Sequence, residues 1–365
     1  MKKIVFITSS LGYGGAAKML CFVAESLVAR GHEVHIVNIK TVVKEGDYER
    51  PVSKKVILHT TEAEGRRGLR RLGQIKKICK IVKKIDADLL VGFTLMPNYM
   101  ATLVGKMTHI PSIISERGDP YRTLSGGMID KLLVSILNRS TGGVFQTDGA
   151  KAFYGKGLQK RGKVIPNPIF IKGEIPEIKY EEREKSVVSV GRLDNNQKRY
   201  DVMLKAFKIF SERHPEYVLK LYGTGPDEAK IKEMVVELRL EDRVIFKGLT
   251  TQPMQDTARD GMFLITSDFE GIANAMLEAM AIGLPVVSTD SSPGGARMVI
   301  TSHQDGILAP IGDYEKIAEA MCEFAENPEL AKSCGEHAKN VIHRFDPDHL
   351  IDEWEQYCIE LCEKR

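Results

Sequence analysis

Short hydrophobic runs alternate with amphipathic stretches along nearly the whole chain. The runs consist mainly of Val, Ile and Leu without polar alternation, a pattern typical of parallel strands that are buried on both faces. The two halves open alike, with a strand, a helix and a second strand at 3–8, 16–30 and 34–39, and again at 187–190, 200–213 and 217–222. Further buried strands are predicted at 89–93, 112–115, 142–147, 243–248, 261–267 and 284–290. This alternation predicts an α/β protein with Rossmann-like, doubly wound parallel sheets.

The length of 365 residues favours two domains over a single hydrophobic core. We expect a first domain over 1–175 and a second over 185–346, with a central cleft between them. The segment 170–186 is polar and contains proline, as expected of a linker. The last segment, about 347–365, has apolar residues at helical spacing, and we expect a closing helix that packs back on the first domain.

Composition indicates a globular protein without membrane spans. The chain is 43% hydrophobic and 28% charged, and it lacks the roughly 18 consecutive apolar residues that a transmembrane helix needs. The opening MKKIVFITSSLGYGG resembles a signal peptide only briefly, because glycines soon follow the apolar stretch Ile4–Ile7. The six cysteines show no zinc-type spacing, so we expect free thiols in a reducing cytoplasm.

The two halves differ sharply in charge. Residues 1–173 contain 29 Lys and Arg against 13 Asp and Glu, a net charge of +16, whereas 174–365 carry −13. Such an asymmetry points to an anionic partner for the first half.

Much of the positive charge falls in 64–85, where a helix with one apolar face is predicted. That face comprises Leu69, Leu72, Ile75, Cys79, Val82 and Ile85. The segment is either a core-packed helix with a solvated basic face or a surface that attracts an anionic membrane. Nucleic acid is not an expected partner, because no recognised binding motif or aromatic interleaving accompanies the basic residues.

Two glutamates stand out in SDFEGIANAMLEAMAIGLPVVSTD, residues 267–290. Glu278 lies in a predicted helix, about 273–282, that is otherwise apolar on every side. We therefore expect a buried helix and a partnered carboxylate. The alternatives are that Glu278 projects to water at the helix end or pairs with an arginine.

Glu270 precedes a turn of small residues between a buried strand and the start of this helix. There, free backbone N–H groups and the helix dipole favour an anion, and parallel sheets bind ligands at the carboxyl ends of their strands. A nucleoside diphosphate sugar offers phosphates to the amides and hydroxyl groups to the two carboxylates.

This acidic segment resembles the motif of retaining glycosyltransferases of the GT-B fold in glycosyltransferase family four, in which seven residues separate two glutamates. Supporting motifs follow in the expected order over nearly the whole chain. They are SSLGYGGAA (9–17), PNP (166–168), VGRLDNNQKRYD (190–201), YGTGP (222–226), FKG (246–248) and DGILAP (305–310). The resemblance implies two Rossmann-like domains in the GT-B arrangement and an enzyme of the bacterial polysaccharide or lipid-linked glycan type.

The resemblance also implies roles for individual residues. Arg192 and Lys198 would bind the donor diphosphate and act in catalysis with Glu270; alternatively, they are chance basic residues of a solvated loop. Glu278 would bind the ribose, and Glu270 the transferred sugar. The other predicted donor-binding residues are Gly14, Gly15, Gly223, Gly225, Lys247, Leu249, Gly271, Ile272, Ala273 and Asn274. Acceptor-binding candidates are Arg117 and Asn167.

Two positions depart from the family pattern. Relatives often have a histidine near the sugar where this chain has Arg117, so a catalytic histidine is not carried over. Arg117 could bind an acceptor phosphate, or it could simply pair with Glu116 or Asp119. Met298 replaces an acid that often follows the turn at 294–295.

A competing motif lies near the N-terminus, where Gly12, Gly14 and Ala17 match a relaxed dinucleotide fingerprint. A dinucleotide site needs an acid at the end of the second strand, whereas Asn38 and Lys40 stand there. An NAD-dependent Rossmann enzyme is therefore disfavoured. A sugar-nucleotide epimerase of the GT-B fold would need additional acid/base residues that the sequence does not identify.

We therefore predict a retaining hexosyltransferase or N-acetylhexosaminyltransferase. Its donor would be a UDP-sugar or GDP-sugar, and its acceptor a glycan such as a polyprenyl-diphosphate-linked saccharide. It would be cytoplasmic and peripherally associated with the inner face of the cytoplasmic membrane. The departing diphosphate would take the acceptor's proton, so neither a metal nor another cofactor is expected.

Overall fold

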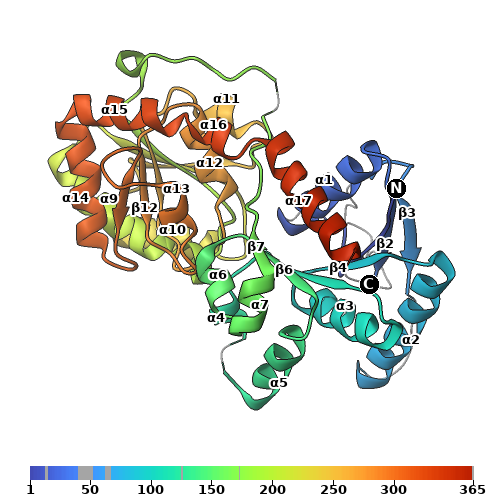
Figure 1. The fold of residues 1–365 in the computed structure, drawn as a ribbon. Helices are drawn as coiled ribbons and strands as arrows, with labels where there is room; N and C mark the ends of the chain where they lie inside the picture. Colours follow the sequence, from blue (N-terminus) through green and yellow to red (C-terminus); the bar gives the residue numbers. More distant parts are fainter. Residues whose placement is uncertain (13–14, 40–51, 62–66, 125, 172, 364–365) are drawn as a thin grey trace. The chain divides into compact units, whose positions relative to one another are not determined.

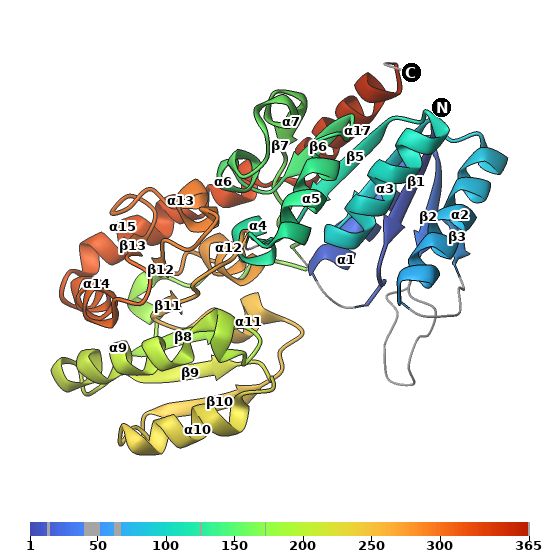
Figure 2. The same ribbon diagram turned by 90° about the horizontal axis from the view of Figure 1, so that it is seen from below.

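The structure is a computed structural model that describes residues 1–12, 15–39, 52–61, 67–124, 126–171 and 173–363. The chain divides into two compact units. Unit 1 comprises Met1–Asn167 with Asp348–Arg365, and unit 2 comprises Pro168–Pro347. Each unit contains one parallel β-sheet flanked by helices (Figure 1 and Figure 2), which confirms the predicted fold class.

The sheet of unit 1 has the strand order β3-β2-β1-β4-β5-β6-β7. The strands are β1 (Lys3–Thr8), β2 (Glu33–Asn38), β3 (Ile57–Thr60), β4 (Leu89–Phe93), β5 (Ser112–Glu116), β6 (Gly142–Phe145) and β7 (Gly162–Val164). In the parallel pairing, Ile4 lies opposite Val34 on one side and Leu89 on the other. Every residue of β4 is buried, because helices cover both faces of a doubly wound sheet.

The helices of unit 1 form two layers. They are α1 (Gly15–Ala29), α2 (Arg67–Ile85), α3 (Leu95–Thr108), α4 (Pro120–Thr123), α5 (Met128–Leu137), α6 (Asp148–Ala152), α7 (Lys156–Arg161) and the C-terminal α17 (Pro347–Cys362). α2 and α3 pack on the face that carries Val5 and Ile7. α1 and α17 lie side by side on the other face (Figure 1), where Arg30 and His32 both bond to Glu355.

Most of the predicted apolar face of α2 contacts the core. Ile75 and Val82 are buried, and Cys79 and Ile85 pack against the same cluster. Leu72, in contrast, is 59% exposed, whereas Gln74 and Ile78 are buried as well. The Gln74 amide turns inward to donate to the Ile39 carbonyl at 2.6 Å. Leu72 therefore falls outside the buried face of the helix.

The sheet of unit 2 has the strand order β10-β9-β8-β11-β12-β13. The strands are β8 (Ser186–Val190), β9 (Val218–Tyr222), β10 (Val244–Gly248), β11 (Met262–Ile265), β12 (Val286–Thr289) and β13 (Ile307–Ala309). The chain passes from β8 outward to β10 and then crosses back to β11 beside β8. Ligand sites of open α/β sheets form at the carboxyl ends of the strands next to such a reversal.

The helices of unit 2 place its core on both sides of this sheet. They are α8 (Asn195–Lys198), α9 (Tyr200–Arg213), α10 (Glu228–Glu237), α11 (Pro253–Thr257), α12 (Asn274–Ala281), α13 (Gly295–Val299), α14 (Tyr314–Glu326), α15 (Pro328–Ala338) and α16 (Val341–Arg344). The largest cluster includes Phe207 and Phe210 from α9, Met321 and Phe324 from α14, and Leu219 from the sheet.

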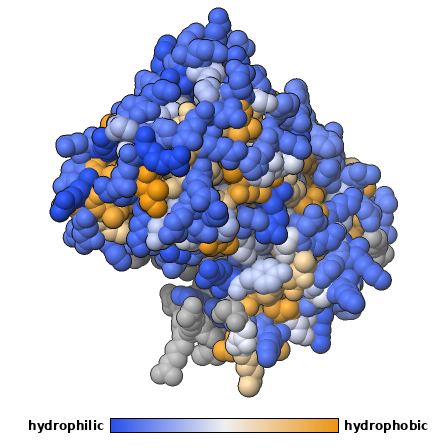
Figure 3. Space-filling view, turned by 90° about the vertical axis from the view of Figure 1, so that its left-hand side faces the viewer, coloured by the Kyte–Doolittle hydropathy of each residue, from blue (hydrophilic) through white to orange (hydrophobic). Residues whose placement is uncertain are grey.

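The surface is mostly hydrophilic on the face drawn in Figure 3, with small hydrophobic patches among the polar side chains. Within the described part of the chain, no helix combines the length and the apolar character needed to cross a bilayer. All six cysteines are free thiols, as predicted, and only Cys79 is partly exposed.

Candidate functional site

The loop after β8 brings Lys198 to the carboxyl edge of the unit 2 sheet. It forms the single helical turn α8, and Arg199 then adopts a left-handed φ of 53° before α9 begins. Asp194 caps α8 by accepting from the Asn196 N–H at 3.2 Å. The Asp227 carboxylate accepts from the Asn195 N–H at 2.7 Å. These contacts fix the backbone that carries Lys198.

Arg199 ties this loop to the one after β11. Its guanidinium donates to both oxygens of Asp268, at 3.0 and 2.9 Å, and also pairs with Asp201 at 3.0 and 3.1 Å. The Asp268 N–H donates to the Gln197 carbonyl at 3.0 Å. Pairing with Asp201 and then Asp268 raises the pKa of Arg199. Neither Arg199 nor Asp268 was predicted from the sequence.

As a result, two predicted catalytic residues meet: Lys198 and Glu270 form a salt bridge, with side chains 17% and 15% exposed. The Ser267 hydroxyl donates to the same carboxylate oxygen at 3.2 Å, and the Glu270 N–H donates to the Ser292 carbonyl at 2.7 Å. Tyr200 is buried nearby, and burial together with the Glu270 charge raises the pKa of its hydroxyl. The pair is therefore held from several sides.

The turn at 271–273 leads into α12, close to the predicted helix start. Ala273 is the N-cap, and Gly283, with a φ of 72°, follows the helix end. The first N–H groups of a helix have no intrahelical acceptor, and the helix dipole favours an anion beside them. A Cβ atom on Gly295 would lie only 1.5 Å from the Gly271 carbonyl oxygen. The close contact between the backbones of Gly295 and Gly271 therefore fixes the position of the turn.

The helix α12 is not buried on every side, so the expectation of a fully buried helix is wrong. Asn274, Ala275 and Glu278 are partly exposed, because positions i, i+1 and i+4 share the face opposite the core. Glu278 is thus half-buried rather than enclosed. The Asn274 Oδ1 atom on the same face is buried and has no hydrogen-bond partner among the described residues.

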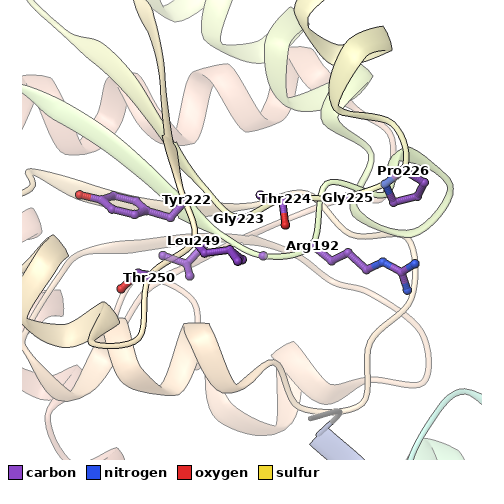
Figure 4. A pocket seen from close by; sticks show the side chains of 10 residues that line it. Arg192, Tyr222, Gly223, Thr224, Gly225, Pro226, Leu249 and Thr250 are labelled. Atoms are coloured by element: carbon purple, nitrogen blue, oxygen red, sulfur yellow. The ribbon is translucent and has the colours of Figure 1, made fainter. Parts of the chain in front are cut away.

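A cavity of about 590 Å³ lies at the ends of β8, β9 and β10 (Figure 4). Its lining includes the predicted donor-site residues Arg192, Gly223, Gly225 and Leu249, together with Tyr222, Thr224, Pro226 and Thr250. Gly223, with a φ of 136°, passes so close to Gly191 that a Cβ atom would meet its carbonyl oxygen at 1.8 Å. Lys247, also predicted, is exposed on β10 and does not line the cavity.

The predicted unit 1 residues fall into two groups. Gly14 lies outside the described residues, and Gly15 is the exposed first residue of α1. Arg117 and Asn167 come together at the carboxyl end of β5, where Arg117 Nη1 donates to Asn167 Oδ1 at 3.2 Å.

One group of side chains in the described residues has the composition of a metal site: His214, Cys322 and Glu326. Arg213 already pairs with the Glu326 carboxylate, and burial raises the pKa of the Cys322 thiol. A cation would have to displace the arginine and deprotonate this thiol. The group also follows the C-terminus of α9, before β9 begins, so it lies at the edge of the sheet opposite to Lys198 and Glu270.

Two family models match consecutive parts of the chain. The model of Glycosyltransferase Family 4 matches residues 13–171, and that of Glycosyl transferases group 1 matches 172–341. The chain belongs to the group 1/family 4 glycosyltransferases. This assignment confirms the glycosyltransferase prediction for both units, and the fold is GT-B.

This glycosyltransferase is 23% identical over 368 residues to an uncharacterized glycosyltransferase of Haemophilus influenzae, covering 97% of the chain and 99% of that relative. It is 25% identical to the N-acetylgalactosamine-N,N'-diacetylbacillosaminyl-diphospho-undecaprenol 4-alpha-N-acetylgalactosaminyltransferase of Campylobacter jejuni, covering 95% and 96%. Among solved structures, Anabaena HepE in complex with UDP-glucose matches with a TM-score of 0.77 and 17% identity, covering 99% of this chain and 100% of HepE. The structural likeness supports the fold.

Proposed function

We propose that this glycosyltransferase moves a hexosyl or N-acetylhexosaminyl group from a nucleotide sugar to a glycan acceptor, with retention of configuration at the anomeric carbon. The observation that carries the proposal is the Lys198–Glu270 salt bridge beside the N-terminus of α12. It places a cation, a carboxylate and helix N–H groups at the edge of the sheet where ligands bind. A UDP-sugar is favoured over a GDP-sugar because HepE binds UDP-glucose.

The positions of these residues indicate which part of the donor each would bind. The cavity at Gly223, Gly225 and Leu249 would take the nucleoside. Arg192 lines the same cavity and would bind the diphosphate with Lys198. An ammonium group has three donors, so Lys198 can keep its bond to Glu270 while it reaches a phosphate oxygen. Glu278 would bind the ribose hydroxyls, and Glu270 those of the transferred sugar.

In the proposed reaction, the bond between the anomeric carbon and the diphosphate oxygen breaks, and its electron pair stays on that oxygen. The acceptor hydroxyl oxygen forms its new bond to the anomeric carbon on the same face of the sugar. Its proton passes to the departing diphosphate. Arg192, Lys198 and the N–H groups of α12 offset the charge that develops on the leaving group. We therefore propose a reaction without a metal or other cofactor.

The proposed acceptor is a polyprenyl-diphosphate-linked or other glycan in surface polysaccharide or glycan biosynthesis. The Campylobacter relative, by its name, acts on a diphospho-undecaprenol-linked saccharide. Such an acceptor would bring the enzyme to the inner face of the cytoplasmic membrane as a peripheral protein. The net charge of +16 over residues 1–173 supports attraction to an anionic membrane.

A donor screen tests the proposal directly. Purified protein is incubated with UDP- and GDP-sugars, with and without lipid-linked acceptors, and released nucleotide is measured. We expect release that depends on acceptor and persists in EDTA. Lys198→Ala should lower kcat about 100- to 1000-fold, the usual effect of losing one donor to a developing oxyanion. Lys316→Ala, at an exposed lysine of α14, serves as the control. Failure of every UDP- and GDP-sugar to bind, or epimerised donor without transfer, would overturn the proposal.

A further inference from the structure

A second polar group stands at the carboxyl end of β5 in unit 1, centred on the guanidinium of Arg117. Its Nε donates to the Ser115 hydroxyl at 2.8 Å, and its Nη1 donates to the Ile165 carbonyl at 3.3 Å and to Asn167 Oδ1 at 3.2 Å. The guanidinium carbon also lies 5.4 Å from the ring centre of Phe93 and 5.3 Å from that of Trp354. These hydrogen-bond partners among the described residues are all neutral.

The charge of Arg117 is therefore not paired within the described residues. Glu116 accepts from the backbone N–H groups of Arg117 and Gly118, both at 3.1 Å, and its other oxygen accepts from the Tyr154 hydroxyl at 2.9 Å. Asp119 caps α4 through the Tyr121 N–H at 2.9 Å. Thus neither carboxylate pairs with the Arg117 side chain, and the simple ion pair considered from the sequence does not form. Glu116 nevertheless attracts the Arg117 charge at longer range.

Two donors in this group lack acceptors within the part of the chain that the structure describes. The Nη2 atom of Arg117 and the Nε1 atom of Trp354 are both buried, and neither has a hydrogen-bond partner among the described residues. An unmatched buried donor is unfavourable, and an unmatched charged donor more so. Burial lowers the pKa of Arg117 to about 9, which still leaves the group charged at neutral pH. Arg117 as a residue is partly exposed, although its Nη2 atom is itself buried.

The surrounding backbone is built to hold the group in place. The Asn98 side chain bonds to both the N–H and the carbonyl of Ser115, at 2.9 and 3.1 Å. Thr94, directly after Phe93, adopts a φ of 75°, a conformation that costs free energy in a non-glycine residue and that clusters at ligand sites. Glu116, which orients the Arg117 backbone, is fully buried, and burial raises its pKa.

We propose that Arg117 is a binding residue for a phosphate oxyanion, with Trp354 Nε1 as a second donor, and that this oxyanion belongs to the diphosphate of the acceptor. The second part rests on the proposed function, which supplies a diphosphate-linked acceptor. A guanidinium with free N–H groups recognises phosphate through charge-assisted hydrogen bonds. Asn167 is then a positioning residue, because it holds Nη1 of the guanidinium.

A neutral sugar hydroxyl is the competing ligand. It would donate one hydrogen bond as well as accept, and Asp119 Oδ2 is a buried acceptor without a partner among the described residues. The charge of Arg117, which forms no ion pair within the described residues, favours the anion, and the experiment separates the two.

Trp354 makes the test selective, because it is the only tryptophan of the chain and lies against Arg117. We expect inorganic pyrophosphate and geranyl diphosphate to change the tryptophan fluorescence of the full-length protein in a saturable manner. Arg117→Gln should weaken both about 10-fold or more, the usual effect of losing one charge-assisted hydrogen bond. Arg117→Lys, which keeps the charge, should lose less. Asn167→Ala should weaken binding while leaving the fold intact by circular dichroism.

The double variant Arg192→Ala/Lys198→Ala distinguishes phosphate binding at Arg117 from phosphate binding at the proposed donor site. It should keep the fluorescence response to geranyl diphosphate and lose binding of UDP, measured by calorimetry. If the wild-type protein shows no response to either phosphate compound, or responds to neutral sugars alone, the inference is wrong. It is equally wrong if the phosphate response depends on Lys198 but not on Arg117. If the wild-type protein did not bind UDP, that result would count against the proposed function instead.

Discussion

Glu278 is placed on the partly exposed face of α12, one helical turn beyond Asn274 at the start of the helix. A carboxylate there can accept hydrogen bonds from two vicinal hydroxyl groups, which a ribose provides. The buried residues on either side, Leu277 and Ala279, fix the helix against the sheet. The carboxylate can therefore act as a preorganised acceptor without a rearrangement of the backbone.

We predict that Glu278→Ala weakens UDP binding about 10- to 100-fold, because hydrogen bonds to a charged group contribute about 1.5–3 kcal/mol. Isothermal titration calorimetry measures the change. Glu329→Ala, at an exposed glutamate in the first turn of α15, should leave the affinity unaltered. Unchanged affinity in the Glu278 variant would remove this residue from the donor site.

Gly295 occupies a position where a side chain would not fit. We predict that Gly295→Ala destabilises unit 2 by about 1–3 kcal/mol, the usual cost of overpacking, because its Cβ would meet the Gly271 carbonyl oxygen at 1.5 Å. UDP affinity should fall as well, since the turn before α12 must move. Thermal unfolding followed by circular dichroism gives the first quantity. Gly127→Ala is the control, since its nearest neighbour would be the Asp130 carboxylate at 3.6 Å. Equal melting temperatures for the two variants would contradict this role.

At the scale of elements, the sequence predicted the strands that contain long apolar runs, and it missed short ones. β7 and β13 contain three residues each and β3 is largely exposed, so none shows a run that stands out from a loop. The single turn α8 was also missed, because it depends on caps from Asp194 and Asp227 rather than on periodicity. Motif resemblance identified Lys198 and Glu270, whereas the Arg199–Asp268 pair that brings them together is a contact between distant segments.

The helix α5 presents an unusual surface for a water-exposed element. Met128, Ile129 and Leu132 are 88%, 74% and 62% exposed, and they share one side of the helix. The basic residues Arg122, Lys131 and Arg139 are exposed nearby in the sequence. Exposed apolar groups with basic neighbours are typical of surfaces that bind anionic lipid. If the proposed enzyme works at a membrane, α5 can insert its apolar side chains into the lipid, and the basic face of α2 can be attracted to anionic headgroups.

We predict that replacing Met128, Ile129 and Leu132 together with Ser reduces flotation with vesicles that contain phosphatidylglycerol. Each side chain contributes up to about 1.5–3 kcal/mol when buried in lipid. Arg70→Ser/Arg71→Ser on α2 should have a smaller effect that disappears at high salt, at about 1 kcal/mol per basic residue. Val236→Ser, at a 57% exposed residue of α10, is the matched control. Flotation of the triple variant at the wild-type level would exclude α5 as a membrane contact.

At the scale of the whole molecule, the last helix belongs to unit 1, although unit 2 precedes it in the chain. Trp354, Tyr357, Cys358 and Leu361 of α17 are all buried. The Gly143 N–H donates to the Tyr357 hydroxyl at 3.0 Å, and the Trp354 and Phe93 rings stack at 5.9 Å. The carboxyl ends of β4 and β5 are therefore shaped by residues from the far end of the chain.

We predict that deletion of residues 347–365 destabilises unit 1 far more than unit 2. Loss of one large buried aromatic side chain alone costs about 3–5 kcal/mol, and the deletion removes two. Differential scanning calorimetry should show the unit 1 transition shifted to a much lower temperature. UDP, whose proposed site lies in unit 2, should still raise the temperature of the unit 2 transition. Deletion of 363–365 alone should alter neither. If both transitions moved together, the two units would unfold as one cooperative structure, and the C-terminal helix would stabilise the whole chain rather than the unit that contains it.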